Sequence, residues 1–168
     1  DSGSTDCTVE LAKEHGAKVA FRAWTNDFSA QRNFALEQTD ADWVLYLDAD
    51  ERLNENVIAE VKRIVASGVM DAQYAFTRKS GAFGKIFSYG VLYPDQVCRL
   101  FPRKAVVWVN KVHEHPECKL PEKHLSGYVT HYTYKDWYEW EGKLCLYTTI
   151  WAEDAYKKGK RTTMAGIF

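Results

Sequence analysis

The chain has 168 residues, of which 46% are hydrophobic and 27% are charged, and its formal net charge is −1. This length and composition are typical of one globular domain with a buried core, and the near-zero charge gives no support for a nucleic-acid partner. No stretch approaches the roughly 18 consecutive apolar residues that a transmembrane helix needs, and the residues present contain no signal-peptide pattern.

The four cysteines lie far apart in the sequence and form no C-x-x-C motif. Their spacing therefore supports neither a zinc knuckle nor a thioredoxin-type redox motif, and reduced thiols in a cytoplasmic protein are the simplest expectation. Because the chain starts at Asp1 without a methionine and ends at Phe168 without a polar tail, we expect a piece of a longer protein, incomplete at both ends.

Helices and strands alternate in the first half of the chain. We expect a turn-rich stretch at 1–6, a short helix that Gly16 ends, a strand at 18–21, a helix at 29–38, a buried strand at 43–47 and an amphipathic helix at 54–68. This alternation predicts an α/β fold with a mostly parallel sheet and crossover helices.

The strand at 43–47 organises this prediction. Its five apolar residues are too few for an ordinary helix and too uniformly apolar for a half-exposed strand, so we expect it to be buried on both faces. It ends at Asp48, Asp50 and Glu51, and ligands bind beyond the carboxyl ends of strands in open α/β sheets. Two carboxylates one residue apart can hold Mg²⁺ together with substrate phosphates. The alternative is a solvated acidic turn before the next helix.

The second half of the chain has a more antiparallel character. Short strands are expected at 74–78, 87–89, 96–101, 106–109 and 127–134, separated by glycine and proline turns. Asp136 and Glu139 form a capping-box-like start for a helix that runs to about Lys158. Four apolar residues share one face of this helix: Trp140, Leu144, Tyr147 and Trp151. Their spacing favours packing in the core, and stacking on acceptor sugars is the alternative for the tryptophans.

Several motifs in order resemble family 2 glycosyltransferases. Residues 1–6 resemble the nucleotide-binding loop of that family, 31–36 the helix before its central strand, and 43–51 its D-x-D strand end. Val112-His113-Glu114 and His131-Tyr132 are similar to the subgroup that builds lipopolysaccharide cores. The resemblance implies a glycosyltransferase A-type, Rossmann-like fold from which the strand before Asp1 is missing. It also implies an inverting transfer from a nucleotide sugar that uses Mg²⁺ or Mn²⁺.

The resemblance divides the single catalytic domain into three parts. Residues 1–68 would bind the nucleotide sugar, 69–134 would face the acceptor, and 136–168 would form a C-terminal helix and a basic tail. The expected acceptor is a glycolipid or an oligosaccharide of a lipopolysaccharide core. The basic residues near the end of the helix either form its solvated terminus or attract an anionic membrane surface at the cytoplasmic face: Lys157, Lys158, Lys160 and Arg161.

On the donor side, a metal held by Asp50 with help from Asp48 would stabilise the departing nucleoside diphosphate. By resemblance Asp1 would contact the base or ribose of a UDP-sugar, although Ser2 stands where the family often has a second acid. Arg32 could reach a phosphate and Asn33 a donor hydroxyl, with ordinary surface roles as the alternative. His131 completes this side, either as a contact to the metal or the diphosphate or as a packed strand residue.

On the acceptor side, Glu114 is the candidate general base that deprotonates the acceptor hydroxyl. Alternatives are a plain loop glutamate, or a transition-metal site made by His113, Glu114 and His115 with Cys118. Gln96 and Arg99 resemble the Q-x-x-R-W motif of processive family members, so they and His113 are placed near the acceptor or leaving group. Leu100 replaces the tryptophan of that motif, which favours the addition of a single sugar.

Two other functions compete with this interpretation. A phosphatase of the haloacid-dehalogenase type also ends a strand in D-x-D, but it needs Thr or Val where this chain has Arg52. A non-catalytic sugar- or nucleotide-binding module would keep the fold without using Glu114 as a base.

Overall fold

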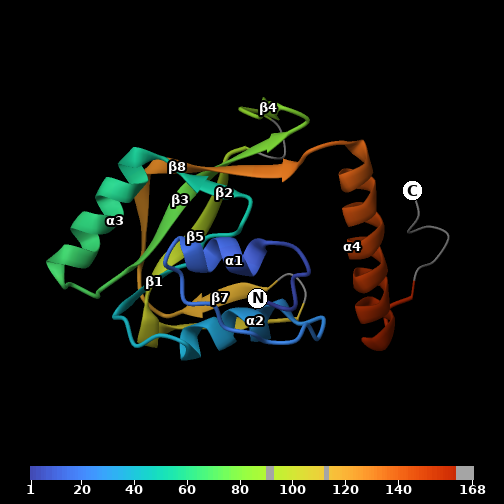
Figure 1. The fold of residues 1–168 in the computed structure, drawn as a ribbon, viewed down its shortest axis with the longest axis horizontal. Helices are drawn as coiled ribbons and strands as arrows, with labels where there is room; N and C mark the ends of the chain where they lie inside the picture. Colours follow the sequence, from blue (N-terminus) through green and yellow to red (C-terminus); the bar gives the residue numbers. More distant parts are fainter. Residues whose placement is uncertain (90–92, 112–113, 162–168) are drawn as a thin grey trace.

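The computed structural model describes residues 1–89, 93–111 and 114–161 (Figure 1). The elements are α1 (Thr8–Glu14), α2 (Phe28–Glu37), β1 (Trp43–Leu45), β2 (Glu51–Leu53), α3 (Glu55–Ser67), β3 (Gln73–Ala82), β4 (Lys85–Ile86), β5 (Asp95–Pro102), a 3₁₀ turn (Arg103–Ala105), β6 (Val106–Val109), β7 (His115–Cys118), β8 (Glu122–Tyr134) and α4 (Trp137–Lys157). No helix in this part of the chain combines the length and the apolar character needed to cross a membrane.

The main sheet is mixed, so the prediction of a mostly parallel sheet is wrong. Its strand order is β1-β5-β3-β8-β2, with β4 on β3, and β6 and β7 form a separate hairpin. Within the described residues only β3 and β8 pair in parallel, while the remaining pairs are antiparallel. The reason is that the residues from Gln73 onward supply four of its six strands, β3, β4, β5 and β8, whereas the chain before them supplies only the short strands β1 and β2.

Two expected strands of the sheet differ from the prediction. Residues 18–21 form no strand; instead the amino group of Asp1 donates to the carbonyl of Ala20, and Arg22 N–H donates to the carbonyl of Asp1. Because this segment does not pair with β1, β1 lies at the edge of the sheet and is only half-buried, so the expected burial of this strand on both faces is wrong. The second strand, expected at 87–89, is replaced by the short β4.

The core lies between α3 and the sheet. Val57 on α3, Phe76 on β3 and Val129 on β8 are fully buried there. Asn54 caps α3 by accepting a hydrogen bond from Val57 N–H at 3.0 Å, and Gly127 on β8 allows this end of the helix to approach. A Cβ at Gly127 would lie only 2.8 Å from the backbone nitrogen of Val57, so glycine sets how closely α3 packs on the sheet.

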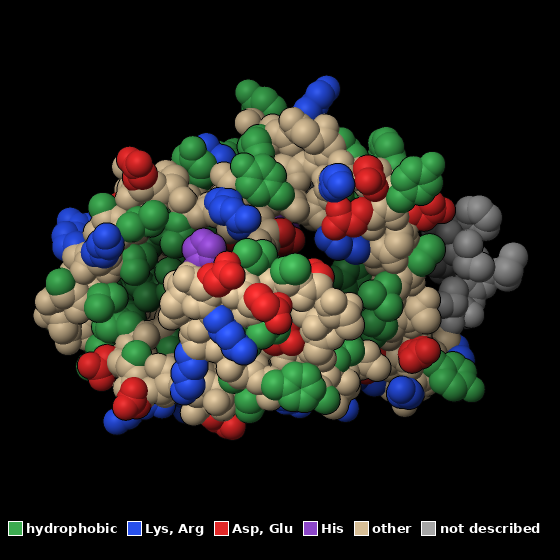
Figure 2. Space-filling view, viewed as in Figure 1, with side chains coloured by type: hydrophobic (Ala, Val, Ile, Leu, Met, Phe, Trp, Pro, Cys, Tyr) green, Lys and Arg blue, Asp and Glu red, His purple; other side chains and the backbone are tan. Residues whose placement is uncertain are grey.

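The C-terminal helix α4 stands beside the end of β8 rather than packing into the core (Figure 1). Asp136 caps it and Glu139 reaches back to the backbone of Lys135, as the sequence predicts. The expected burial of its apolar face is wrong, however. Trp137 is 65% exposed and Trp151 is 55% exposed, and Figure 2 shows hydrophobic side chains exposed along this helix. Amphipathic spacing alone therefore does not identify what this helix packs against.

Candidate active site

The turn after β1 is held by a buried carboxylate at its end. Glu51 is the first residue of β2 and its side chain is fully buried. Its Oε2 accepts a hydrogen bond from Asp48 N–H at 3.1 Å, and its own N–H donates to the carbonyl of Asp48 at 2.9 Å. These two bonds close the turn 48–51, so Glu51 fixes the backbone on which Asp48 and Asp50 stand.

Arginines from three elements converge on this turn. Arg99 on β5 donates to Asp48 Oδ2 at 2.8 Å and to Glu51 Oε1 at 3.0 Å, while Arg32 on α2 donates to Asp48 Oδ1 at 3.0 Å. Arg78 on β3 reaches Glu51 Oε1 at 3.5 Å. Burial raises the pKa of Asp48, but attraction to Arg99 and then Arg32 outweighs it, so this pKa lies below its usual value. Asp48 is therefore an ionised anchor whose two oxygens are both paired.

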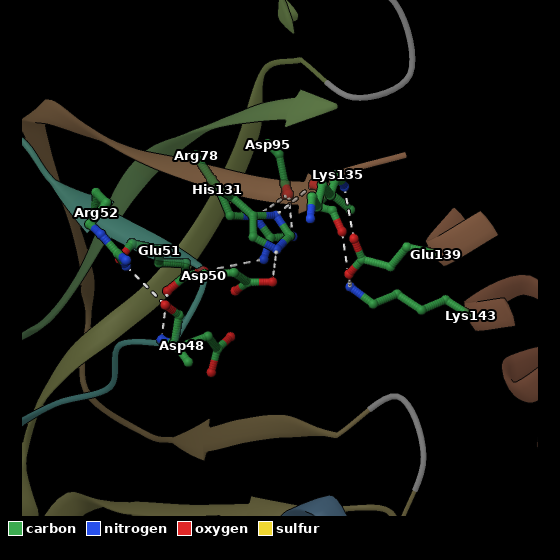
Figure 3. Close-up of polar contacts among 12 residues, drawn as sticks. Asp48, Asp50, Glu51, Arg52, Arg78, Asp95, His131, Lys135, Glu139 and Lys143 are labelled. Carbon is green, nitrogen blue, oxygen red and sulfur yellow. Dashed lines mark hydrogen bonds and ion pairs between the residues drawn. The ribbon is translucent and has the colours of Figure 1, made fainter. Parts of the chain in front are cut away.

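Asp50 and His131 form a separate pair beside that network (Figure 3). Glu51 on β2 is the register partner of His131 on β8, which brings Asp50 Oδ2 to 3.4 Å from His131 Nε2. Tyr132 N–H also donates to the carbonyl of Asp50 at 2.9 Å. The register of two antiparallel strands therefore places a carboxylate and an imidazole next to one another.

Few side chains at this turn are free to bind a divalent ion. In the described part of the chain, no three side chains of His, Cys, Asp or Glu lie close enough together to form a preformed metal site. Asp48 does not join Asp50 and His131, because its oxygens are bonded to arginines. Asp50 and His131 alone suit an ion that keeps several waters and takes its other ligands from substrate phosphates, as Mg²⁺ does.

Glu114 lies on the far side of Arg32 from the turn 48–51. Arg32 Nε and Nη2 each lie 3.2 Å from Glu114 Oε1, and the guanidinium stacks over the Trp108 ring with its carbon 4.6 Å from the ring centre. One arginine therefore holds both the Glu114 carboxylate and the Asp48 carboxylate, and an aromatic face keeps that arginine in place.

A cavity of about 730 Å³ collects these groups. Asp48, Asp50, Glu114 and His131 all line it, and it also contains Tyr147 from α4. Asp1 lies outside, in a neighbouring cavity that shares only Gln31 and Ala35 of α2 with the first. The Asp1 carboxylate accepts hydrogen bonds from Gly3 and Ser4 within its own loop.

Other predicted site residues lie elsewhere. Asn33 does not face the cavity, since its amide donates to the carbonyl of Trp108 at 2.8 Å and accepts from Trp108 N–H at 2.9 Å. It anchors β6 rather than a donor hydroxyl. Gln96 and Arg99 line a second cavity instead of the first. His113 lies outside the described residues.

Residues that the prediction did not select also shape the site. Glu51 stands in the sequence only as one of three acids, and nothing in the short strand Glu51–Leu53 shows that its side chain is fully buried. Arg78 donates to Asp95 at 2.6 Å and also lines the first cavity; its signal is a charge in the middle of a strand. Tyr147 was assigned to the core because of its helical spacing, and no pattern in the sequence distinguishes these two environments.

Comparison with known proteins adds independent information. The family model described as Glycosyl transferase family 2 matches residues 1–114. An uncharacterized glycosyltransferase of Rickettsia typhi is 27% identical over 181 residues, which cover 96% of this chain and 59% of that protein. One from Rickettsia conorii is 40% identical over 79 residues, or 47% of this chain and 28% of that protein. The glycosyltransferase SunS of Bacillus phage SPbeta is 36% identical over 70 residues, or 39% of this chain and 17% of that protein. The chain thus spans 59% of the length of the R. typhi protein.

Proposed function

Because the chain belongs to glycosyl transferase family 2, we propose that it forms the reaction centre of an inverting, metal-dependent glycosyltransferase. Its donor is a nucleotide sugar, with UDP favoured by the resemblance of the loop at 1–6. The observation that carries the proposal is the common cavity of Asp50, His131 and Glu114. In this proposal Asp50 and His131 would be the metal-binding pair and Glu114 the carboxylate base, which are the two functions that a direct displacement at a sugar carbon uses.

In this proposal Asp50 and His131 hold Mg²⁺ or Mn²⁺, which when bound neutralises charge on the departing diphosphate. Asp48 supports them indirectly. Its pairing with Arg32 and Arg99 fixes the turn, and it leaves Arg32 close enough to the cavity to contact a donor phosphate. Preorganised positive groups of this kind stabilise developing negative charge without further rearrangement.

Glu114 acts as the general base. The acceptor hydroxyl oxygen forms a bond to the anomeric carbon of the donor, the bond from that carbon to the diphosphate oxygen breaks, and the hydroxyl proton passes to the Glu114 carboxylate. Attack opposite to the leaving group inverts the configuration at the anomeric carbon. Arg32 holds the carboxylate in the cavity wall through Oε1 at 3.2 Å, which leaves Oε2 as the oxygen that would receive the proton.

For the acceptor we propose a glycolipid or a lipopolysaccharide-core oligosaccharide at the cytoplasmic face of a membrane. Support comes from α4, which exposes aromatic side chains and carries exposed Lys157 and Lys158 at its end. Aromatic rings suit the interface of a bilayer and lysines attract anionic lipids. Tyr147 of the same helix lines the cavity, which connects this surface to the reaction centre.

A donor screen tests the proposal. UDP-, GDP- and ADP-sugars are offered to the purified protein with and without Mn²⁺, and release of the nucleoside diphosphate is measured. We expect UDP-sugar turnover that requires the metal and falls about 100-fold or more in Asp50→Asn. The control Asp71→Asn, at an exposed residue paired with Lys123, should keep wild-type turnover. Metal-independent turnover would remove the proposed role of Asp50 and His131.

The binding-module alternative predicts a different result. Under that alternative, Glu114→Gln would leave function unchanged, and no donor would be consumed even when a nucleotide binds.

A further inference from the structure

The two ring nitrogens of His131 have different partners in the structure. Nε2 lies 3.4 Å from Oδ2 of Asp50, the other member of the proposed metal-binding pair. Nδ1 lies 3.2 Å from the hydroxyl oxygen of Thr133, and within the described residues this is its only hydrogen bond. Thr133 is therefore the partner of the nitrogen that Asp50 does not contact.

A break in strand register occurs at Thr133. Tyr132 of β8 pairs with Gly81 of β3. The next residue of β3, Ala82, pairs with Tyr134, so the residue of β8 between the two pairs has no partner on β3. A bulge of this kind bends a strand locally and can redirect a side chain, and bulges are common beside active sites. The local geometry at Thr133 is therefore a specific feature of β8 next to the metal-binding pair.

Helix α4 also holds the backbone of this residue. Lys143 donates to the carbonyl of Thr133 at 2.9 Å and pairs with Glu139 at 2.8 Å (Figure 3). The Lys143 nitrogen also lies 5.3 Å from the centre of the Tyr134 ring. The backbone that carries the Thr133 hydroxyl is thus tied to α4 as well as to the sheet, which limits its movement relative to His131.

The chemistry of an imidazole explains why the partner of Nδ1 matters. A neutral imidazole carries one proton, so one nitrogen donates a hydrogen bond and the other accepts. A carboxylate accepts hydrogen bonds and does not donate them, so Asp50 favours the proton on Nε2 of His131. A nitrogen that binds a metal must be free of its proton, so the proton has to lie on Nδ1 when Nε2 is a ligand.

A hydroxyl group can serve both of these forms. It donates to Nδ1 while Nε2 keeps its proton, and it accepts from Nδ1–H once Nε2 is a ligand. A carboxylate or a carbonyl in the place of the Thr133 hydroxyl could only accept, and an ammonium group could only donate. Metal-binding histidines donate through their other nitrogen to an outer partner, which sets the tautomer and the orientation of the ring.

We propose that Thr133 is a positioning residue for His131, and that its hydroxyl reverses its hydrogen bond to Nδ1 when His131 becomes a metal ligand. One proton leaves Nε2 to solvent water and another enters at Nδ1 from water, so the imidazole stays neutral and no other reactant is needed. This inference rests on the proposed function, in which Asp50 and His131 hold the ion. Thr133 itself contacts neither the ion nor the substrate.

Binding of Mn²⁺ in the presence of UDP, followed by electron paramagnetic resonance of the free ion, tests this role without turnover. Thr133→Val keeps the shape of the side chain and removes the hydroxyl, so we expect it to weaken Mn²⁺ binding about tenfold or more. Thr133→Ser keeps the hydroxyl and should restore most of the affinity. The matched control is Thr130→Val, which makes the same change on β8 but on the opposite face from His131, and it should bind Mn²⁺ as the wild type does.

The affinities separate this inference from the proposed function. Equal Mn²⁺ affinity in Thr133→Val and the wild type would overturn the inference, while the proposed function stands. A wild-type protein that binds no Mn²⁺ with UDP, GDP or ADP would overturn both, because Asp50 and His131 would then hold no ion. The thermal melt of each variant shows whether it is folded.

NMR of the His131 ring nitrogens tests the reversal in the wild-type protein, and so does not depend on the folding of Thr133→Val. Long-range ¹H–¹⁵N spectra distinguish the two tautomers at pH about 8.5, where imidazoles ordinarily carry no charge, and His131→Gln assigns the signals. We expect the proton on Nε2 without metal and on Nδ1 with Mg²⁺ and UDP. A proton that stays on Nε2 in the loaded protein, or that already lies on Nδ1 without metal, would overturn the inference.

Discussion

Replacing Glu51 by glutamine removes the negative charge beneath the turn 48–51. In the structure Glu51 Oε1 accepts from Arg99 at 3.0 Å and from Arg78 at 3.5 Å, and Oε2 accepts from Asp48 N–H at 3.1 Å. A glutamine oxygen can keep the bond to Asp48 N–H, but its NH₂ group then faces the guanidinium of Arg99. The variant therefore loses the charged contacts while it keeps the shape of the side chain.

The magnitude follows from the partners that remain. A buried hydrogen bond to a charged group contributes about 1.5–3 kcal/mol, and removing one partner of a buried ion pair costs about 3–5 kcal/mol. Arg99 still pairs with Asp48, and Arg78 still pairs with Asp95, so the low end applies. We expect the free energy of unfolding to fall by about 3 kcal/mol, which for a chain of this length lowers Tm by about 6–12 °C.

Urea unfolding followed by far-UV circular dichroism and tryptophan fluorescence measures this loss. The matched control is Glu55→Gln, at an exposed glutamate in the first turn of α3, where the change should cost about 0.5 kcal/mol through the helix dipole. A Glu51→Gln protein within 1 kcal/mol (about one third of the expected loss) of the wild type at an unchanged m-value would refute the reasoning. Glu51 would then not be the residue that holds the turn.

Four further predictions follow from the site. Glu114→Gln should lower kcat by about 10²–10⁴-fold while calorimetry shows unchanged donor binding; full activity would exclude Glu114 as the base. Asn33→Ala removes two hydrogen bonds to Trp108 and should cost about 2 kcal/mol in urea unfolding, with an unchanged midpoint counting against the anchor role. Burial raises the pKa of Cys98 to about 12, so at pH about 8 iodoacetamide should alkylate it more than tenfold slower than exposed Cys7, and equal rates would contradict this. The lowered pKa of Asp48 contributes stability that is present above its unfolded value of about 3.9 and is lost as pH falls through the lower folded value. Asp48→Asn should therefore flatten the acid side of the stability curve, and an equally steep decline would show that other carboxylates dominate.

Local signals predicted the helices well. Asn54 and Gly68 mark the two ends of α3 because an asparagine can cap the first turn and a glycine can adopt the left-handed conformation, here with φ of 67°. Asp136 marks the start of α4 for the same reason. These interactions lie within a few residues of one another, so the sequence pattern contains them.

Pairing between distant strands could not be predicted in the same way. The parallel pair of β3 with β8 and the position of β1 at an edge depend on contacts between residues far apart in the chain. Helical spacing likewise shows that α4 has an apolar face but not that this face is exposed. Periodicity describes one element, whereas burial depends on all of the others.

The candidate site was predicted in part. Asp48, Asp50, Glu114 and His131 line one cavity while Asp1 lies outside it, and the chemical roles of these residues stay predictions. Arg99 and Asn33 show the limit of residue type as a guide. A guanidinium or an amide makes the same kinds of hydrogen bond to a substrate as to the protein itself. Here Arg99 donates to the Glu51 carboxylate and Asn33 to the carbonyl of Trp108.

Through Arg32, helix α2 contacts two other parts of the site. The single guanidinium pairs with Asp48 at 3.0 Å on one side and with Glu114 at 3.2 Å on the other. Gln31, the neighbouring residue on the same helix, accepts a hydrogen bond from Arg22 at 2.9 Å. A rotation of this helix would therefore move Arg32 relative to both Asp48 and Glu114. In the proposed reaction, where Asp48 belongs to the donor side and Glu114 to the acceptor side, one side chain would couple the two.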